Sequence, residues 1–441
     1  MDKNEIIEIL QDWNFWKKDL ESGIERSTYL NRLKDFLKTG QIVVITGARR
    51  AGKSFLMRQL IKSLIYNGVK RNNILMVNFE DPRFTELDTK ILQKIYEVYL
   101  EFLNPKGDVF IFLDEVQEVS GWEKWVRTIH ELKKAKLVIS GSNAKLLSAE
   151  LSTLLTGRHI DLEVFPLSFQ EYLVFNGIDL KDKLDFIGKR VEIERLFIKY
   201  LEWGGFPEVV LSDEKKKLLF HYFEDIVNKD LVKRYKIRKP AKLNSLAKFY
   251  LTNISSSITF NSLEKFLDVS VDTVEKFSHY FEDVYLIFFL KRFSFKVKEQ
   301  EKSPRKVYAI DTGLANVLGF RFSRNSGRLA ENIIFVELLR KKTLGENNLE
   351  FYYWRNSQNK EVDFIIKENL KVSKALQICW EINRPETRTR EIKPLLKVME
   401  KLKIDKGFII TQDLEKEENI GEKKIKYLPL WKWLLFDLER Y

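Results

Sequence analysis

Cysteine is almost absent from this chain of 441 residues, which contains only Cys379. A single cysteine excludes an internal disulfide and any zinc cluster built from several thiolates. Long apolar runs are also missing, since stretches such as Val284 to Leu290 are far too short to cross a bilayer. Because no apolar secretion signal stands near the start, we expect a cytoplasmic location and no membrane contact.

The remaining composition is that of a globular protein, with 44% hydrophobic and 32% charged residues. The length corresponds to roughly two to four domains. Lysine and arginine outnumber aspartate and glutamate by 76 − 64 = 12. This positive excess permits a nucleic-acid partner without requiring one.

The most informative segment is GARRAGKS, which runs from Gly47 to Ser54 directly after the apolar run Ile42 to Ile45. It fits the pattern G-x-x-x-x-G-K-[ST], in which glycines let successive backbone N–H groups turn inward around a phosphate. Lys53 would bring a positive charge to the β- and γ-phosphates of ATP, and the Ser54 hydroxyl would bind Mg²⁺. The residues expected to bind ATP or ADP here are Gly47, Ala48, Arg49, Arg50, Ala51, Gly52, Lys53, Ser54 and Phe55.

A helix is expected to follow this loop, from Lys53 to about Tyr66. Its N-terminal dipole would add to the attraction for an anion. Its apolar face is expected to consist of Phe55, Leu56, Leu60, Ile61 and Leu64.

The apolar run Val109 to Leu113 predicts a buried parallel strand that ends in two acids, Asp114 and Glu115. Such a strand end is the Walker B pattern of ATPases. Asp114 would orient the Mg²⁺ shell, and Glu115 would act in catalysis by polarising the attacking water. A solvated strand end is the alternative, which the P-loop upstream disfavours.

The next strand, Lys136 to Ser140, is followed by small polar residues. In ATPases with an extra strand between the P-loop and Walker B strands, a catalytic polar sensor stands here near the γ-phosphate, and Asn143 or Ser142 would take that role. A turn or helix cap explains each residue nearly as well. We expect an α/β fold whose five-stranded parallel sheet holds the site at its carboxyl edge, with strands at 42–46, 74–79, 109–113, 136–140 and 160–165.

Arg158 lies between the sensor strand and the following strand, where an arginine finger commonly projects. An arginine supplied by a neighbouring subunit would stabilise transition-state charge, which requires a homo-oligomer. An ordinary surface salt bridge explains Arg158 equally well.

Ser168 and Glu171 have the spacing of a capping box and mark the end of this core. Residues 169 to 238 then show an amphipathic helical pattern, as expected for a helical lid. Within it, the segment from Trp203 to Pro207 reads WGGFP, and Pro207 in this turn could lie against the adenine. A plain loop between helices is the alternative.

Residues 239 to 322 have the pattern of a winged helix. We expect a short helix over 262–267 capped by Asn261, a second helix from Val271 to about Phe281, and a hairpin with strands Tyr285 to Phe295 and Val307 to Ile310.

The second of these helices is acidic, with Asp272, Glu275, Glu282 and Asp283 against Lys276, so it would repel DNA phosphates. Basic residues instead cluster from Lys229 to Lys242 and in the wing. The wing residues are Lys291, Arg292, Lys296, Lys298, Lys302, Arg305 and Lys306. DNA contact through this linker and wing is one interpretation, and a solvated surface or a protein-facing lid is the other.

The last part of the chain, about 323 to 441, has an order of elements that resembles the PD-(D/E)xK nuclease fold. The expected elements are a helix with Glu331 and Glu337, strands Phe351 to Trp354, Glu361 to Ile366 and Leu376 to Ile382, a helix after Arg390 and Glu391, and a strand Gly407 to Thr411.

A nuclease of this fold needs carboxylates and a lysine around Mg²⁺. Counting from Asp363, the E-x-K positions hold Gln377 and Cys379, which replace neither the carboxylate nor the ammonium. Shifting the pattern to Glu381 and Asn383 supplies no lysine either, although Lys374 or Lys360 could reach the site from nearby. We therefore expect an inactive domain that binds nucleic acid or protein.

Taken together, the motifs GARRAGKS, FLDEVQ, ISGSNAKLL, LLTGRHIDLEVFPLSFQEYL, WGGFPEVV and YYWRNSQNKEVDFII resemble archaeal and bacterial AAA+ ATPases whose core precedes the domain of unknown function numbered 4143. The resemblance covers nearly everything after residue 30. It implies ATP binding, a helical lid, a winged helix and a nuclease-like C-terminal domain, with no implied substrate.

The expected domains are an N-terminal helical segment (1–38), the ATPase core (39–168), the lid (169–238), the winged helix (239–322) and the nuclease-like domain (323–441). In the N-terminal segment, Trp13, Phe15 and Trp16 are expected to be packing anchors. Two functions follow: a Mg²⁺-dependent ATPase coupled to DNA or a protein partner, or a nucleotide-switched signalling module with little turnover.

Overall fold

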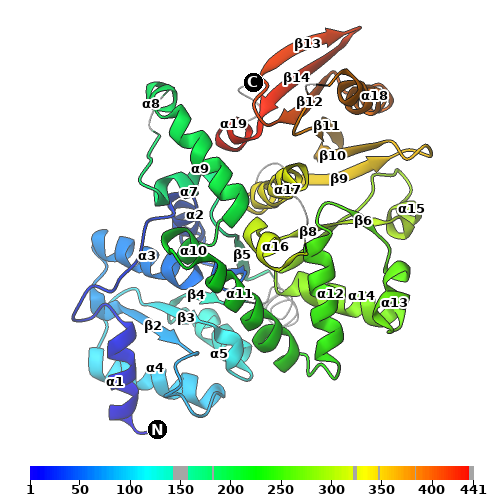
Figure 1. The fold of residues 1–441 in the computed structure, drawn as a ribbon. Helices are drawn as coiled ribbons and strands as arrows, with labels where there is room; N and C mark the ends of the chain where they lie inside the picture. Colours follow the sequence, from blue (N-terminus) through cyan, green and yellow to red (C-terminus); the bar gives the residue numbers. More distant parts are fainter. Residues whose placement is uncertain (143–156, 181–182, 321–324, 346–347, 383, 437–441) are drawn as a thin grey trace. The chain divides into compact units, whose positions relative to one another are not determined.

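The computed structural model describes residues 1–142, 157–180, 183–320, 325–345, 348–382 and 384–436 (Figure 1). They divide into two compact units, Met1–Val164 and Phe165–Tyr441. Among these residues, no helix is long and apolar enough to cross a membrane.

The first unit is built on a parallel sheet of five strands in the order β2-β3-β4-β1-β5. The strands are β1 (Ile42–Gly47), β2 (Ile74–Asn78), β3 (Phe110–Asp114), β4 (Lys136–Ser140) and β5 (His159–Val164). The central strands β1 and β3 are buried along their whole length, because helices cover a parallel sheet and favour continuous apolar runs. The sequence-based expectation of a five-stranded parallel sheet is confirmed.

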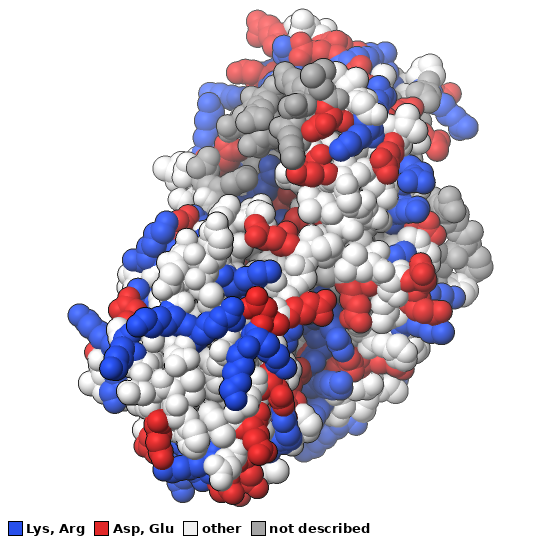
Figure 2. Space-filling model, turned by 90° about the vertical axis from the view of Figure 1, so that its left-hand side faces the viewer, with Lys and Arg blue, Asp and Glu red and all other residues white. Residues whose placement is uncertain are grey.

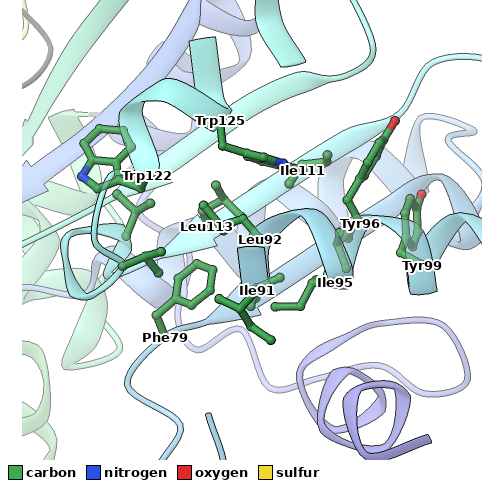
Figure 3. Packing of buried hydrophobic residues seen from close by; sticks show 14 of the residues in the cluster. Phe79, Ile91, Leu92, Ile95, Tyr96, Tyr99, Ile111, Leu113, Trp122 and Trp125 are labelled. Carbon is green, nitrogen blue, oxygen red and sulfur yellow. The ribbon is translucent and has the colours of Figure 1, made fainter. Parts of the chain in front are cut away.

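The helices of this unit are α1 (Lys3–Trp13), α2 (Ser27–Lys38), α3 (Lys53–Tyr66), α4 (Thr89–Leu103) and α5 (Trp122–Glu131), with short 3-10 turns η1 (Arg71–Asn73) and η2 (Val116–Glu118). One apolar cluster joins α4 and α5 to strand β3 (Figure 3). In it, Trp122 and Trp125 of α5 and Leu92 of α4 lie around Ile111 and Leu113 of β3. This packing fixes the end of β3 at which the acidic pair stands.

The segment that follows α1 covers the edge strand β2. The Asn14 side chain accepts from the Met76 N–H at 2.7 Å and donates to the Met76 carbonyl at 2.8 Å. The Trp16 indole donates to the Ile74 carbonyl at 2.7 Å. These bonds satisfy an edge that would otherwise remain unpaired. Phe15 is buried, and Trp13 and Trp16 pack against the same apolar cluster, so their role as packing anchors is confirmed.

The second unit begins with helices, as expected for residues 169 to 238. They are α7 (Phe169–Phe175), α8 (Lys183–Gly188), α9 (Arg190–Trp203), α10 (Pro207–Leu211), α11 (Lys215–Asp225) and the π-helical η3 (Ile226–Lys233). The capping box is present, with Ser168 accepting from the Glu171 N–H and the Glu171 carboxylate accepting from the Ser168 N–H.

Gly204 ends α9 with a φ of 74°. A Cβ atom at this position would lie 2.0 Å from Asp311 Oδ1, so the WGGFP turn requires glycine there.

A helix pair and a small sheet follow. The elements are α12 (Pro240–Thr252), β6 (Ser257–Ile258), α13 (Phe260–Leu267), α14 (Val271–Asp283), β7 (Ile287–Leu290), α15 (Val297–Lys302), β8 (Arg305–Ala309) and α16 (Thr312–Leu318). The three strands pair antiparallel in the order β6-β8-β7.

Two local expectations in this region are wrong. Thr259, not Asn261, caps the first helix, because its side chain accepts from the Ser262 N–H and the helix already begins at Phe260. The first hairpin strand ends at Leu290, and α15 occupies the segment between the two strands. The charged run of α15 has no apolar alternation that would extend a strand.

The last region contains α17 (Ser326–Thr343), β9 (Leu349–Arg355), β10 (Glu361–Glu368), β11 (Lys371–Ile378), α18 (Pro385–Lys401), β12 (Lys406–Thr411), β13 (Lys416–Ile420), β14 (Lys423–Pro429) and α19 (Leu430–Leu435). Its six-stranded sheet has the order β13-β14-β12-β11-β10-β9, in which β12 is parallel to β11 and β14 and the other neighbours are antiparallel. Strand β11 ends at Ile378 instead of the expected Ile382, and α18 starts before Arg390. The turn between them leaves Glu381 outside the sheet.

Candidate functional site

The loop GARRAGKS connects β1 to α3 at the carboxyl edge of the parallel sheet. Gly47 has a φ of 140°, and a Cβ atom there would lie 2.1 Å from the Val164 carbonyl oxygen. Gly52 has a φ of 97°, in the left-handed region. Both positions therefore require glycine, the first because β5 approaches closely and the second because the chain must turn into the helix.

Lys53 is the first residue of α3, and its side chain is buried. Its Nζ donates to the carbonyl oxygens of Gly47 and Ala48, each at 3.1 Å. The same nitrogen lies 3.8 Å from Glu115 Oε1. The ammonium is thus held over the loop, next to the acids that end β3.

Ser54 and Asp114 meet at this edge. The Ser54 hydroxyl is hydrogen-bonded to Asp114, and the Ser140 hydroxyl at the end of β4 also donates to Asp114 Oδ1. Burial and the neighbouring Glu115 carboxylate raise the pKa of Asp114, whereas these hydroxyls and the Lys53 charge oppose the rise. Ser140 is a site residue that the sequence reasoning missed, although it is the last residue of a strand that ends at this edge.

Glu115 follows β3 in a left-handed backbone conformation, with a φ of 53°. Its N–H donates to Ser140 Oγ at 3.1 Å. Its Oε2 accepts from the Gln117 side-chain amide at 2.6 Å. The carboxylate is almost buried, and it lies on the same edge as Lys53.

Ser142 lies two residues beyond β4, and only 1% of it is exposed. Its hydroxyl has no hydrogen-bond partner within the part of the chain that the structure describes. A buried hydroxyl without a partner is costly unless a ligand or water satisfies it. The alternative sensor, Asn143, lies outside the described residues.

The remaining loop residues differ in their surroundings. Ala48 and Ala51 are buried, and Arg49 pairs with Glu80 at 2.9 Å, beyond the end of β2. Arg50 is exposed and has a φ of 66°. Phe55 was expected on the apolar face of α3, but 40% of it is exposed and the expectation is wrong. Its position in the first turn places it on the outer side of the helix, while Leu56, Leu60 and Ile61 are buried.

Arg158 lies at the amino ends of the parallel strands, whereas the P-loop lies at their carboxyl ends. It immediately precedes β5, and its carbonyl accepts from the N–H of Ile42 at the start of β1. Its guanidinium pairs with Glu131 at the end of α5. Because β1 has six residues, its amino and carboxyl ends are about 20 Å apart at about 3.3 Å per residue. Arg158 therefore cannot reach the P-loop of its own chain.

Pro207 begins α10 in the second unit. Its predicted contact with the nucleotide stays a prediction.

The expected nuclease residues of the last region are engaged within the protein. Asp363 Oδ1 accepts from Lys306 at 3.0 Å, and its Oδ2 accepts from the Ile378 N–H at 2.9 Å. The Gln377 amide donates to Glu391 at 2.7 Å. Burial raises the pKa of Cys379 to about 12, so this thiol stays protonated at neutral pH.

The lysine that contacts Asp363 is Lys306. Lys374 instead pairs with Glu368 at 3.3 Å. The Lys306 ammonium also lies 2.6 Å from Glu331 and 2.8 Å from Glu361. Only 2% of its side chain is exposed, so its assignment to a basic wing surface is wrong. The signal that could have shown this is its place directly before the apolar residues Val307, Tyr308 and Ala309 of strand β8, all of which are buried. Within the described ranges, no group of three or more His, Cys, Asp or Glu side chains is arranged to hold a metal ion.

Three known domain families match the chain. They are an AAA domain over residues 39–173, a domain of unknown function (DUF8612) over 194–325 and a domain of unknown function (DUF4143) over 326–433.

Two relatives are similar over almost their whole lengths. The uncharacterized protein MJ1544 of Methanocaldococcus jannaschii is 35% identical over 410 residues, which cover 90% of this chain and 88% of that protein. An uncharacterized protein of Haemophilus influenzae is 30% identical over 418 residues, which cover 92% of this chain and 98% of that protein. Among solved structures, the Walker-type ATPase paby2304 of Pyrococcus abyssi is 13% identical with a TM-score of 0.47, and the alignment covers 69% of this chain and 99% of that one.

Proposed function

This chain belongs to the family that joins an AAA domain to the domain of unknown function 4143, and we propose that it binds ATP with Mg²⁺ and hydrolyses it at the carboxyl edge of the parallel sheet. One observation carries the proposal. Lys53 and Ser54 at the start of α3 meet Asp114 and Glu115 at the end of β3. These side chains come from segments about 60 residues apart in the sequence, and their types are those needed to bind a triphosphate and activate water.

ATP binding rests on the loop between β1 and α3. With glycine at both ends, backbone N–H groups can surround the β-phosphate, and the N-terminus of α3 adds a favourable dipole. The Lys53 ammonium, now on the Gly47 and Ala48 carbonyls, is free to exchange these neutral acceptors for phosphate oxygens. Charge-assisted bonds to phosphate are stronger than bonds to neutral carbonyls, so the exchange favours the bound state.

The donor groups at this edge suit Mg²⁺, which prefers oxygen ligands. Asp114 is a buried carboxylate hydrogen-bonded to the Ser54 hydroxyl. We propose that Ser54 binds the ion and that Asp114 orients its shell. When bound, Mg²⁺ would neutralise negative charge on the β- and γ-phosphates.

Hydrolysis needs a base for the attacking water and a group near the γ-phosphate. Glu115 would polarise the water, because its carboxylate lies beside Lys53. The hydrogen bond from the Glu115 N–H to Ser140 holds the backbone of Glu115 in place. The unsatisfied hydroxyl of Ser142 supports a sensor role at the end of β4, with Asn143 as the alternative. Pro207 would contact the adenine from a helical lid.

We propose that a second copy of the chain completes this site by supplying Arg158. Because Arg158 lies about 20 Å from its own P-loop by strand length, it would act as an arginine finger only on a neighbouring subunit. Its ion pair with Glu131 would hold it at the subunit surface until assembly. The protein would then be an active homo-oligomer.

The second unit would couple the nucleotide cycle to a partner. We propose that residues 239–322 are a winged helix, supported by the order β6-α13-α14-β7-α15-β8 and the sheet order β6-β8-β7. We also propose that residues 323–441 are a nuclease-like domain without cleavage activity, supported by the order α17-β9-β10-β11-α18-β12.

DNA contact through the linker and wing would be weak and electrostatic. Lys291 pairs with Glu301 at 2.5 Å and Lys296 with Glu299 at 3.2 Å, so the wing is less basic than its lysine count suggests. Figure 2 displays the left-hand side of Figure 1, not the side on which α13 and α15 are drawn, and there too basic and acidic side chains are interspersed. We expect little sequence preference and an affinity that falls steeply between roughly 50 and 200 mM salt, because the contacts would be to phosphates. Tight, salt-insensitive binding of one DNA sequence in fluorescence anisotropy would contradict this.

A nucleotide switch with slow turnover is the second candidate. The observation that favours it is the bond from the Gln117 amide to Glu115 Oε2, which engages the catalytic carboxylate. Such a resting arrangement would let ATP occupancy expose a partner surface without rapid hydrolysis.

Steady-state ATP hydrolysis by the purified protein, with and without DNA, separates the two candidates. A strong stimulation of ATP turnover by DNA would support the coupled ATPase. A single burst with ADP retained supports the switch. Failure to bind ATP at all would contradict both.

A further inference from the structure

Residues 14–26, between α1 and α2, form a strap that runs from β2 to the P-loop within the first unit. At one end, Asn14 and Trp16 bond to the backbone of β2. At the other end, Gln59 of α3 holds three backbone groups of the strap. Its amide donates to the carbonyls of Ser22 at 2.9 Å and Ile24 at 2.8 Å, and its Oε1 accepts from the Arg26 N–H at 3.1 Å.

Arg26, at the end of this strap, contacts the P-loop itself. Its guanidinium donates to the carbonyl oxygen of Ala51 at 2.8 Å. Only 2% of Arg26 is exposed. The guanidinium carbon also lies 4.5 Å from the ring centroid of buried Tyr29. A buried cation is costly unless its hydrogen bonds and ring contacts are well formed, so these contacts fix its position closely.

The Ala51 carbonyl belongs to the peptide that also carries the Gly52 N–H. In a trans peptide the C=O and N–H point in opposite directions. With the Ala51 carbonyl directed at the Arg26 guanidinium, the Gly52 N–H of the same peptide is directed away from Arg26. In a P-loop it is the inward backbone N–H groups that hold the phosphate. Gly52 has the freedom to flip this peptide, because its φ of 97° belongs to a region where glycine alone is unstrained.

We infer that Arg26 is a positioning residue for phosphate binding: it fixes the Ala51–Gly52 peptide so that the Gly52 N–H faces the nucleotide. The inference rests on the proposed function, because it concerns the same loop. It assigns a role to the N-terminal segment, which lies before the matched AAA domain of residues 39–173. Without Arg26, the peptide could rotate and the loop would lose an aligned donor before ATP binds.

The test measures equilibrium binding of a fluorescent ATP analogue by the full chain, with both Kd and the bound fraction at saturation. Arg26→Ala should raise Kd about tenfold, which corresponds to about 1.4 kcal/mol, because the Ala51–Gly52 peptide loses the hydrogen bond that orients it, while the saturating stoichiometry stays at the wild-type value. Arg26→Lys keeps a cation but lacks the planar fork, so its Kd should lie between the two.

Arg71→Ala is the matched control. Arg71 also anchors the strap, through the Phe15 carbonyl at 2.7 Å and Asp19 at 2.7 Å, but it does not touch the loop. It should leave Kd unchanged even if stability falls. A purely structural role of Arg26 would lower the stoichiometry and leave Kd at the wild-type value, which would overturn the inference. If Arg26→Ala does not fold, a wild-type Kd for Arg26→Lys would overturn it as well.

Lys53→Ala separates this inference from the proposed function. Loss of binding in Lys53→Ala with a normal Kd in Arg26→Ala would refute only the role of Arg26. Normal binding in Lys53→Ala would refute the nucleotide site itself.

Discussion

The backbone N–H of Glu115 donates a hydrogen bond to the hydroxyl of Ser140 at 3.1 Å. The same hydroxyl donates to Asp114, so one side chain at the end of β4 holds both acids at the end of β3. Glu115 has a left-handed backbone, which costs conformational energy in a residue other than glycine. The Ser140 bond helps to keep it there, and thereby fixes the direction of the carboxylate that we propose to be catalytic.

Removing this hydroxyl should slow turnover more than it weakens binding. We expect Ser140→Ala to lower kcat about two- to tenfold with a small change in KM, because the neutral hydrogen bond from the Glu115 N–H is worth about 0.5–1.5 kcal/mol. Ser140→Thr keeps a hydroxyl and should retain most of the activity. Steady-state kinetics of the two variants checks this, and an unchanged kcat in Ser140→Ala would show that Glu115 does not depend on Ser140.

Arg158 should act only between subunits. We expect Arg158→Ala and Lys53→Ala each to be inactive as pure proteins, and an equimolar mixture to recover part of the ATPase activity. Recovery follows because some mixed interfaces pair an intact P-loop with an intact arginine. Glu131→Gln, which removes the carboxylate that pairs with Arg158 and with Arg127 but leaves Arg158 itself in place, serves as the control and should remain active. Full activity of Arg158→Ala, or no recovery on mixing, would count against a finger in trans.

The last region should not cut DNA. Asp363 is hydrogen-bonded to Lys306 and to the Ile378 N–H, and the two positions expected to hold a carboxylate and a lysine hold the neutral amide of Gln377 and the protonated thiol of Cys379. Incubation with plasmid, linear and branched DNA in Mg²⁺ or Mn²⁺ should leave the DNA intact. Cleavage that disappears in Asp363→Ala would prove this prediction wrong.

Stability should fall as pH rises because of Glu331. Burial raises its pKa from 4.5 to about 8, although Lys306 at 2.6 Å opposes the rise. The folded state therefore binds more protons than the unfolded state between these values. Its stabilisation is complete below the unfolded pKa and is lost as pH rises through about 8.

Thermal unfolding followed from pH 5 to pH 9 tests this effect. The apparent Tm of the wild type should decrease with pH, and Glu331→Gln, which imitates the protonated side chain, should show a shallower decrease. Equal slopes in the two proteins would mean that Glu331 does not titrate in this range.

The parallel sheet and the loop between β1 and α3 could be predicted because their signals are local. Strands buried on both faces give continuous apolar runs, and the spacing of Gly47, Gly52 and Lys53 leaves few alternatives. Helix α3 has the expected bounds for the same reason. Phe55 was misplaced because the first helical turn lies at the rim of the covered face, where an apolar residue need not be buried.

Long-range partners could not be predicted. Lys306 meets Asp363 across 57 residues, and Arg26 meets Ala51 across 25 residues. Nothing in the local pattern distinguishes such buried cations from the many surface lysines and arginines. Strands β13 and β14 were missed because their charged residues, such as Glu417 and Lys424, suggest a solvated loop unless the neighbouring strand is known.

The central claim is that Lys53 binds the phosphates in the ground state whereas Glu115 acts only during hydrolysis. The most direct measurement is ATP binding and single-turnover hydrolysis in Lys53→Ala and Glu115→Gln, side by side with the wild type. Our account predicts that Lys53→Ala loses ATP binding, and that Glu115→Gln binds ATP as tightly as the wild type but does not release phosphate. Normal phosphate release by Glu115→Gln would contradict the assignment of the site.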